Sequence, residues 1–166
     1  MKKDTIDSRP IVLIGMTGCG KTSIGRRLAS LLGLAFIDTD DMLSSDRGAG
    51  ELFSSIGEEE FRKIEYSALL RSLDAGKCVI ATGGGAPTYR LSYETIKDKS
   101  RPILICRARI DAPANPPVCG DPLKYKAILS YREPIYLSLA EAKFDNTGIE
   151  KTAEAIASYL LLGKKS

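Results

Sequence analysis

The sequence predicts an α/β protein with three layers, in which helices cover both faces of a central parallel sheet. Two observations indicate this class: short apolar runs rich in β-branched residues recur along the chain, and segments with helical spacing separate them. Parallel strands covered on both faces have continuous apolar sequences, and a helix usually connects each strand to the next. With 166 residues, the chain is expected to form a single domain over residues 1–166.

The first predicted unit is a strand, a glycine-rich loop and a helix. Residues 11–14 are Ile-Val-Leu-Ile, a buried-strand pattern that stops at Gly15. After Lys21 a helix is indicated by apolar residues at helical spacing, namely Ile24, Leu28, Leu31 and Leu32. Gly33 stands where a glycine commonly ends a helix.

Further strands and helices alternate along the rest of the chain. Strands are expected at residues 34–37, 78–81 and 103–106, with a short polar helix before the last of them. A helix from about Glu58 to Leu73 is expected to bury one face, made of Phe61, Ile64, Ala68 and Leu69. Two helices within residues 123–142, a strand near Phe144 and a closing helix over residues 149–162 complete the pattern.

Residues 107–122 differ in composition from the elements around them. This stretch is rich in proline and has no apolar periodicity. Such a composition predicts a loop, and it is expected to be the mobile part of the molecule.

The composition excludes several classes of function. The chain has no histidine, so it has no Ser-His-Asp or Cys-His pair and no histidine-ligated metal. Its net charge is only +3 and the basic residues are scattered, which argues against a nucleic-acid partner. Its four cysteines form no C-x-x-C pair, and no apolar run is long enough for a membrane span. We therefore expect a cytoplasmic protein with reduced cysteines and no membrane partner.

Residues 15–22 match the phosphate-loop pattern G-x-x-x-x-G-K-[ST] between a predicted strand and a predicted helix. In such a loop, backbone N–H groups and the helix N-terminus face a phosphate. The pattern predicts that Lys21 reaches the β- and γ-phosphates of a nucleotide and that Thr22 ligates Mg²⁺. The predicted nucleotide-binding residues are Gly18, Cys19, Gly20, Lys21, Thr22 and Ser23. The alternative is a glycine turn that only leads into a helix.

Other residues narrow the class of nucleotide-using protein. A GTPase would read guanine with Asn-Lys-x-Asp, but neither Asn115 nor Asn146, the only asparagines, precedes a lysine. A motor or helicase would be much longer and would carry an acidic pair at a strand end for magnesium and the attacking water. In this chain, the only predicted strand that ends in acidic residues is the second one.

Asp38 and Asp40 follow the second predicted strand. Two residues apart in an extended segment, their side chains would point to the same side. One carboxylate would then serve Mg²⁺ and the other would accept the proton of a substrate hydroxyl. The alternative is a solvated acidic turn that caps the next helix.

Gly83, Gly84 and Gly85 follow a predicted buried strand, and three glycines in a row suggest close approach of the backbone to a ligand. A plain tight turn is the alternative. Arg62 lies one step round its helix from Phe61, and Arg132 lies near an expected helix break. Taken alone, each arginine is more typical of a solvated helix surface than of a ligand site.

In combination, these motifs resemble the shikimate kinase family over nearly the whole chain. The shared features, in order and spacing, are residues 15–22, Phe36-Ile37-Asp38-Thr39-Asp40, Gly57-Glu58 with Phe61-Arg62 and Glu65, Gly83-Gly84-Gly85, and Arg132 with Pro134 and Tyr136. The resemblance implies a fold similar to the P-loop nucleoside monophosphate kinases with a mobile lid. It also implies ATP- and Mg²⁺-dependent phosphorylation of the 3-hydroxyl of shikimate, in the route to aromatic amino acids.

The family pattern also implies roles for individual residues. Lys21, Asp40 and Arg132 would be catalytic, and Thr22 with Asp38 would serve Mg²⁺. The acceptor would be held by Asp40, Arg62, Gly83, Gly84, Gly85 and Arg132. A planar guanidinium suits the carboxylate of shikimate and a carboxylate suits its hydroxyls, so the chemistry agrees with these roles.

One motif departs from the family pattern. The family's lid carries an arginine in Arg-Pro-Leu-Leu, whereas this chain has Ala-Asn-Pro-Pro-Val at residues 114–118. Arg109 is the predicted substitute over the ATP phosphates, with Arg107 or Lys124 as alternatives. The other functions left open are a different small-metabolite kinase, such as a gluconate kinase, and a weakly active nucleotide-binding relative. We expect a monomer that acts on a small molecule.

Overall fold

The computed structural model describes residues 7–43, 48–107 and 120–163. Within these ranges the chain forms five strands, β1 (Ile11–Ile14), β2 (Ala35–Asp38), β3 (Cys78–Ala81), β4 (Arg101–Arg107) and β5 (Ala142–Asn146). It also forms helices α1 (Lys21–Leu32), α2 (Thr39–Leu43), α3 (Gly48–Ile56), α4 (Glu58–Leu73), α5 (Arg90–Lys99), α6 (Pro122–Leu139) and α7 (Ile149–Leu162), with a 3₁₀ turn η1 (Ala86–Thr88).

The five strands form one parallel sheet in the order β2-β3-β1-β4-β5. β1 lies in the centre, where Val12 pairs with Ile80 of β3 on one side and with Pro102 of β4 on the other. The predicted three-layer fold class is therefore confirmed. Because all strands run in one direction, their carboxyl ends meet at one edge of the sheet.

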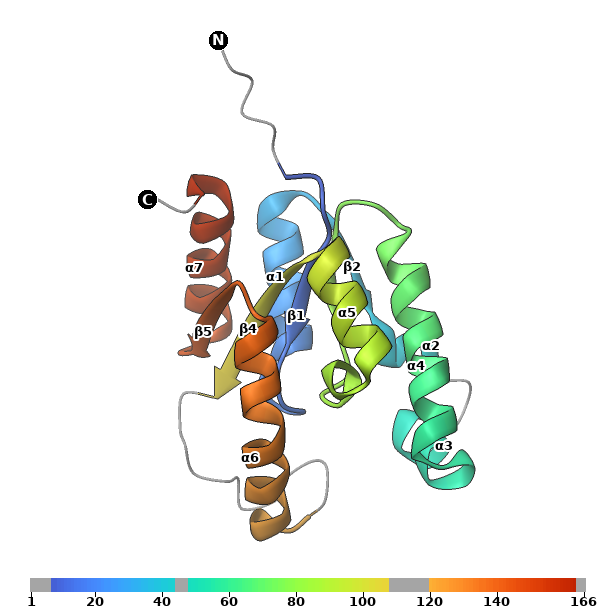
Figure 1. The fold of residues 1–166 in the computed structure, drawn as a ribbon. Helices are drawn as coiled ribbons and strands as arrows, with labels where there is room; N and C mark the ends of the chain where they lie inside the picture. The colour runs from blue at the N-terminus through green and yellow to red at the C-terminus, as the bar shows by residue number, and fades with distance from the viewer. Residues whose placement is uncertain (1–6, 44–47, 108–119, 164–166) are drawn as a thin grey trace.

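Helices cover both faces of the sheet, as Figure 1 shows. On one face α1 and α7 pack on alternate strand residues, and this core includes Leu13, Ile24, Leu28, Ile105 and Ile156. On the other face α4, α5 and α6 build a second core, which includes Ile14, Leu69, Ile80, Ile96 and Tyr136. Adjacent residues of one strand thus enter opposite cores, which explains why β1 and β3 are apolar throughout.

Several predicted boundaries agree with the structure. α1, α4, β3 and α7 match their predicted ranges, and Gly33 caps α1 with φ 65°. β2 begins and ends one residue later than predicted, and β4 is longer at both ends. The segment that forms α2 and α3 was not assigned from the sequence.

The prediction of two helices within residues 123–142 is wrong, because α6 runs unbroken through Pro134. Proline lacks the N–H that would bond to the carbonyl of Ser130. Both residues are exposed, so that carbonyl is accessible to solvent, while Tyr125, Tyr136 and Leu139 keep the opposite face in the core. The packing of the apolar face therefore preserves the helix across the proline.

The predicted buried face of α4 is also partly wrong. Ile64 is 40% exposed, whereas Arg62 and Glu65 are buried together with Phe61, Ala68 and Leu69. The observed buried face of α4 therefore includes two charged residues in place of Ile64. These two can be buried because they form an ion pair with each other, which a pattern of apolar residues does not reveal.

Most of the predicted lid, including Arg109, lies in residues 108–119, outside the described residues, as does Cys119. Of the other cysteines, Cys19 and Cys78 are buried and Cys106 is partly buried; all three are free thiols. Among the described helices, none has the length and apolar character that crossing a membrane would require.

Candidate active site

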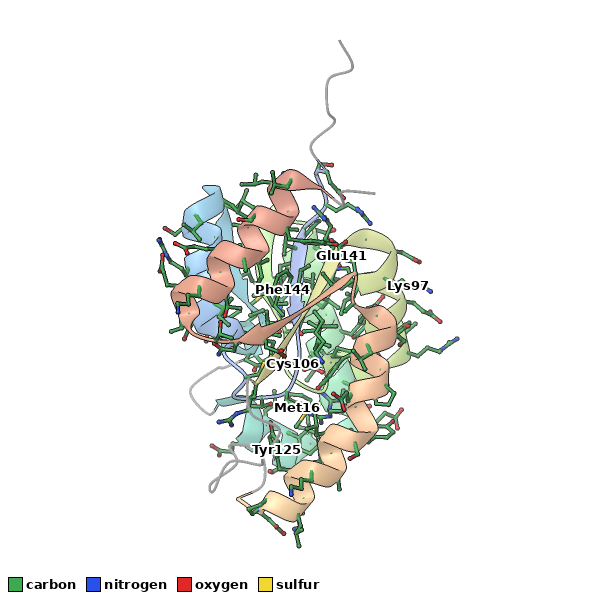
Figure 2. All side chains as sticks on the ribbon, turned by 90° about the vertical axis from the view of Figure 1, so that its left-hand side faces the viewer. Met16, Lys97, Cys106, Tyr125, Glu141 and Phe144 are labelled. Carbon is green, nitrogen blue, oxygen red and sulfur yellow. The ribbon has the colours of Figure 1, made fainter. Side chains whose placement is uncertain are left out.

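The candidate site lies at the carboxyl ends of the parallel strands, the edge at which open α/β sheets bind ligands. The loop of residues 15–20 leads from β1 into α1 at this edge, and residues 83–85 follow β3. Met16 of the first loop lies close to Tyr125 of α6 (Figure 2), and both belong to the second core. The loop that borders the site is therefore anchored by side chains packed in the second core.

The loop of residues 15–20 surrounds a small pocket of about 260 Å³. Its lining includes the predicted nucleotide-binding residues Gly18, Gly20, Lys21, Thr22 and Ser23. Cys19, also predicted to bind nucleotide, is buried below the loop and is absent from that lining. For this residue, only the backbone is in a position to face a ligand.

Lys21 is held at the floor of this pocket. Its Nζ donates to the carbonyl oxygens of Gly15 at 2.8 Å and Met16 at 2.9 Å, and the side chain is only 7% exposed. The ammonium group is thus placed within the loop by backbone dipoles before any ligand arrives. A phosphate oxygen that enters the pocket has this cation within reach.

Asp38, the last residue of β2, connects the first turn of α1 with the first turn of α2. Its Oδ2 accepts a hydrogen bond from Thr22 Oγ1 at 2.7 Å, and its Oδ1 accepts one from the backbone N–H of Asp40 at 3.0 Å. The carboxylate therefore orients the hydroxyl that was predicted to serve a metal, and it also caps the start of α2.

The assumption of an extended segment at residues 38–40 is wrong, because α2 begins at Thr39 and Asp40 lies in its first turn. The alternative of an acidic cap is correct for Asp38. Nevertheless both carboxylates line the small pocket. Helix geometry, not strand alternation, brings Asp40 there.

Asp40 is partly buried at the edge of the pocket. Burial raises the pKa of its carboxyl above the ordinary 3.8, the charge of Asp38 raises it further, and Lys21 opposes the shift. A carboxyl with a raised pKa is a better proton acceptor when ionised, which suits the role predicted for it.

A second, larger pocket of about 1280 Å³ opens beside the first. The two share three lining residues, Thr17, Asp40 and Gly84. Arg62, Glu65 and Arg132 line only the larger pocket. The phosphate loop therefore borders directly on a cavity that carries two arginines.

Arg62 is fixed by several contacts. Its Nη1 donates to Glu65 Oε2 at 2.7 Å, Nη2 lies 3.5 Å from Glu58 Oε1, and the guanidinium stands over the rings of Phe53 and Phe61 at 6.0 and 5.6 Å. Its buried Nε has no hydrogen-bond partner in the described part of the chain. This arginine is held rigidly and retains an unused donor.

Glu65 lines the larger pocket, and the sequence assigned it no role beyond its place in the family pattern. It is 2% exposed, and burial raises the pKa of its carboxyl while the Arg62 guanidinium opposes that shift. A buried carboxylate three residues after a buried arginine orients the guanidinium toward the cavity.

The three consecutive glycines allow close approach of neighbouring side chains, while their predicted approach to a ligand stays a prediction. A Cβ at Gly83 would collide with Glu65 Oε1, and a Cβ at Gly85 would collide with the guanidinium of Arg62. At Gly84 it would lie 2.7 Å from Thr17 Oγ1. The backbone of residues 83–85 therefore lies very close to other side chains of the site. Any residue larger than glycine at these positions would displace the groups that line the two pockets.

Arg132 and Tyr136 bring α6 to this glycine segment. Tyr136 donates from its hydroxyl to the Gly84 carbonyl at 2.5 Å and is 2% exposed. Burial raises the pKa of this phenol, so it stays a donor. Arg132, one turn earlier on α6, lines the larger pocket. The same helix therefore holds the glycine segment through Tyr136 and places a cation in the pocket through Arg132.

The structure therefore brings together all predicted site residues that it describes, with Cys19 present only through its backbone. Arg109 lies outside the described residues, and its role stays a prediction. Phe53, Thr17 and Asn146 also contribute contacts but were not singled out from the sequence. Phe53 carries no charge and belongs to no motif, and Thr17 occupies a position of the phosphate-loop pattern that any residue can fill.

Comparison with known proteins gives a consistent family match. The family model described as shikimate kinase matches residues 17–162. A shikimate kinase of Moorella thermoacetica is 37% identical over 156 residues, which cover 87% of this chain and 89% of that protein.

Solved structures agree. A shikimate kinase from Acinetobacter baumannii in complex with shikimate aligns with a TM-score of 0.78 and 27% identity over 97% of both chains. A gluconokinase from Sinorhizobium meliloti aligns with a TM-score of 0.58 and 14% identity over 93% of both chains. The second similarity extends to the fold alone.

Proposed function

The chain belongs to the shikimate kinase family, and from this premise we propose how its two adjoining pockets perform the family's reaction. The protein is a kinase that transfers a phosphoryl group from ATP to the 3-hydroxyl of shikimate. The observation that carries the proposal is the shared wall of Thr17, Asp40 and Gly84 between the phosphate-loop pocket and the arginine-lined pocket. A donor in one pocket and an acceptor in the other would meet at that wall.

The smaller pocket binds the ATP phosphates in this proposal. The N–H groups of the loop and the N-terminus of α1 face the phosphates, and Lys21 Nζ exchanges its bonds to Gly15 and Met16 for phosphate oxygens. A cation already held in place loses little freedom when the phosphates bind, so it is available to stabilise charge that develops during transfer.

Thr22 and Asp38 fit a magnesium ion at the same pocket. Both are oxygen donors, their side chains lie 2.7 Å apart, and Mg²⁺ in kinases takes one or two protein oxygens together with phosphate oxygens. When bound, the ion would neutralise part of the phosphate charge. Thr22 and Asp38 would hold it at the loop, on the side of the pocket that Asp38 borders.

The larger pocket binds shikimate through groups of complementary chemistry. Arg62, whose Nε has no partner among the described residues, and Arg132 supply planar cations for the acceptor's carboxylate. Glu65 and the aromatic rings keep the first guanidinium in place, and residues 83–85 keep the cavity open for the ring. The acceptor's hydroxyls then lie toward Asp40 and the phosphate loop.

Asp40 acts as the proton acceptor in this arrangement. The 3-oxygen of shikimate forms a bond to the γ-phosphorus, the bond from that phosphorus to the β,γ-bridging oxygen breaks, and the hydroxyl proton passes to the Asp40 carboxylate. Lys21 stabilises the charge that collects on the leaving ADP, and Arg132 lies beside Gly84, near the same junction.

We propose a monomer as the working unit. ATP is a cytoplasmic metabolite, so we place the reaction in the cytoplasm. Arg109 is proposed as the cation over the phosphates from the sequence alone.

The arginine roles predict a specific kinetic change. Arg62→Lys and Arg132→Lys should each raise the KM for shikimate about tenfold while the KM for ATP stays within twofold, because an ammonium keeps the charge but lacks the planar fork. Lysine is preferred to alanine at position 62, since alanine would leave Glu65 buried without its cation.

Steady-state kinetics with each substrate varied in turn provides the measurement. Arg71→Lys, the same change at an exposed position of α4, is the matched control and should alter neither constant. If the KM for shikimate is unchanged in both variants, the carboxylate binds elsewhere and the assignment of the larger pocket is incorrect.

A further inference from the structure

Asn146, the last residue of β5, contacts the phosphate loop from a segment 127 residues away in the sequence. Its Nδ2 donates to the carbonyl of Cys19 at 2.9 Å, and its Oδ1 accepts from the backbone N–H of Gly148 at 3.1 Å. The side chain is partly buried between the loop and the start of α7. Both ends of the amide are therefore bonded to backbone.

The chemistry of the two partners fixes the orientation of this amide. A backbone N–H only donates and a carbonyl only accepts, so the oxygen must face Gly148 and the nitrogen must face Cys19. An aspartate in the same place would present a second acceptor to the Cys19 carbonyl. The site thus requires a side chain with both a donor and an acceptor.

The contact determines the direction of one peptide group of the loop. The described chain has no cis peptide bond, and in a trans peptide the C=O and the following N–H point in opposite directions. When the Cys19 carbonyl points to Asn146, the N–H of Gly20 points away from it. Gly20 lines the phosphate-loop pocket, so this N–H is directed to the pocket side.

Gly20 is adapted to the same contact. Its φ is 103°, and a Cβ there would lie 2.5 Å from Asn146 Nδ2. The phosphate-loop pattern requires glycine at this position. In this chain the close approach of Asn146 is a second reason why position 20 must be glycine.

We infer that Asn146 is a positioning residue that holds the Cys19–Gly20 peptide so that the Gly20 N–H is directed at a nucleotide phosphate. The inference rests on the proposed nucleotide site and names a residue that supports it from outside the loop pattern. The predicted effect concerns the phosphates, because the bond is made to the loop backbone. The nucleoside plays no part in it.

The test compares the binding of ATP and of inorganic tripolyphosphate, which lacks the nucleoside, by titration calorimetry. Asn146→Ala should raise the Kd for both about tenfold and leave the KM for shikimate within twofold, since the free peptide no longer presents its N–H in advance. Asn146→Asp should weaken both ligands at least as much. The unfolding temperature without ligand should stay within a few degrees.

Thr147, the next residue, is exposed and provides matched controls. Thr147→Ala should change neither Kd by more than twofold, and Thr147→Asp shows how much of the aspartate effect is charge alone. If tripolyphosphate binds to Asn146→Ala as tightly as to the unaltered protein, the inference is overturned. It is also overturned if only ATP binding weakens, because the asparagine would then act on the nucleoside.

A measurement on the unaltered protein remains decisive if a variant does not fold. By NMR, the side-chain NH₂ protons of Asn146 should exchange slowly before and after tripolyphosphate is added, while the Gly20 amide shifts on binding. Rapid exchange without ligand would contradict a preformed contact. Failure of the unaltered protein to bind tripolyphosphate would instead count against the nucleotide site itself.

Discussion

Replacement of Lys21 by alanine should reduce kcat by about a hundredfold or more, which corresponds to about 2.7 kcal/mol of lost transition-state stabilisation. The ammonium is buried in the phosphate loop and donates to the carbonyls of Gly15 and Met16 and to the Cys19 sulfur. These three partners are uncharged, so loss of the hydrogen bonds in the alanine variant should change the unfolding temperature without ligand by only a few degrees.

Lys97→Ala is the matched control, because this lysine is exposed on α5 and points away from the protein in Figure 2. Its kcat and unfolding temperature should equal those of the unaltered protein. A Lys21→Ala protein that keeps more than about a tenth of the turnover would show that the loop does not use this cation in catalysis.

Asp40→Asn should lower kcat by about a hundredfold or more and leave the KM for ATP within threefold, because the amide has the same shape but accepts no proton. The pKa of Asp40 is raised by burial and by Asp38, so its carboxylate is lost on acidification at a higher pH than an ordinary aspartate. The profile of kcat/KM against pH should therefore fall on the acid side in the unaltered protein, and this fall should be absent in the variant.

Asp38→Asn is the control that separates the two carboxylates. It removes charge at the proposed magnesium site but retains an oxygen that accepts the Asp40 N–H, so added Mg²⁺ should restore part of its activity. Added Mg²⁺ should not restore Asp40→Asn. An identical response of both variants to magnesium would contradict the separate roles of metal ligand and proton acceptor.

The sheet and most helices were predictable because their signals are local. Four continuous apolar runs and the apolar spacing of α1 and α7 mark buried elements directly in the sequence. The continuity of α6 was not predictable in the same way. Proline at position 134 is a local signal against a helix, and the structure tolerates it because only an exposed bond is lost while Tyr136 and Leu139 remain packed.

The site was predictable where a motif prescribes a backbone shape, as in residues 15–22. The site was less predictable where two charged side chains are buried together. The environment of Arg62 depends on Glu65 and Phe53, and the second of these lies on a helix that periodicity did not indicate. The contact between Asn146 and Cys19 joins segments that are 127 residues apart in the sequence, so no local pattern contains both residues.

The most direct test of the account is an assay of ADP release from ATP by the full chain, run in parallel with shikimate, with gluconate and without an acceptor. The two arginines and the carboxylate of Asp40 are arranged for a small hydroxylated acid, and the family match identifies that acid as shikimate. We predict rapid ADP release with shikimate and only background release in the other two reactions. Equal release with gluconate, or release that needs no acceptor, would contradict the account.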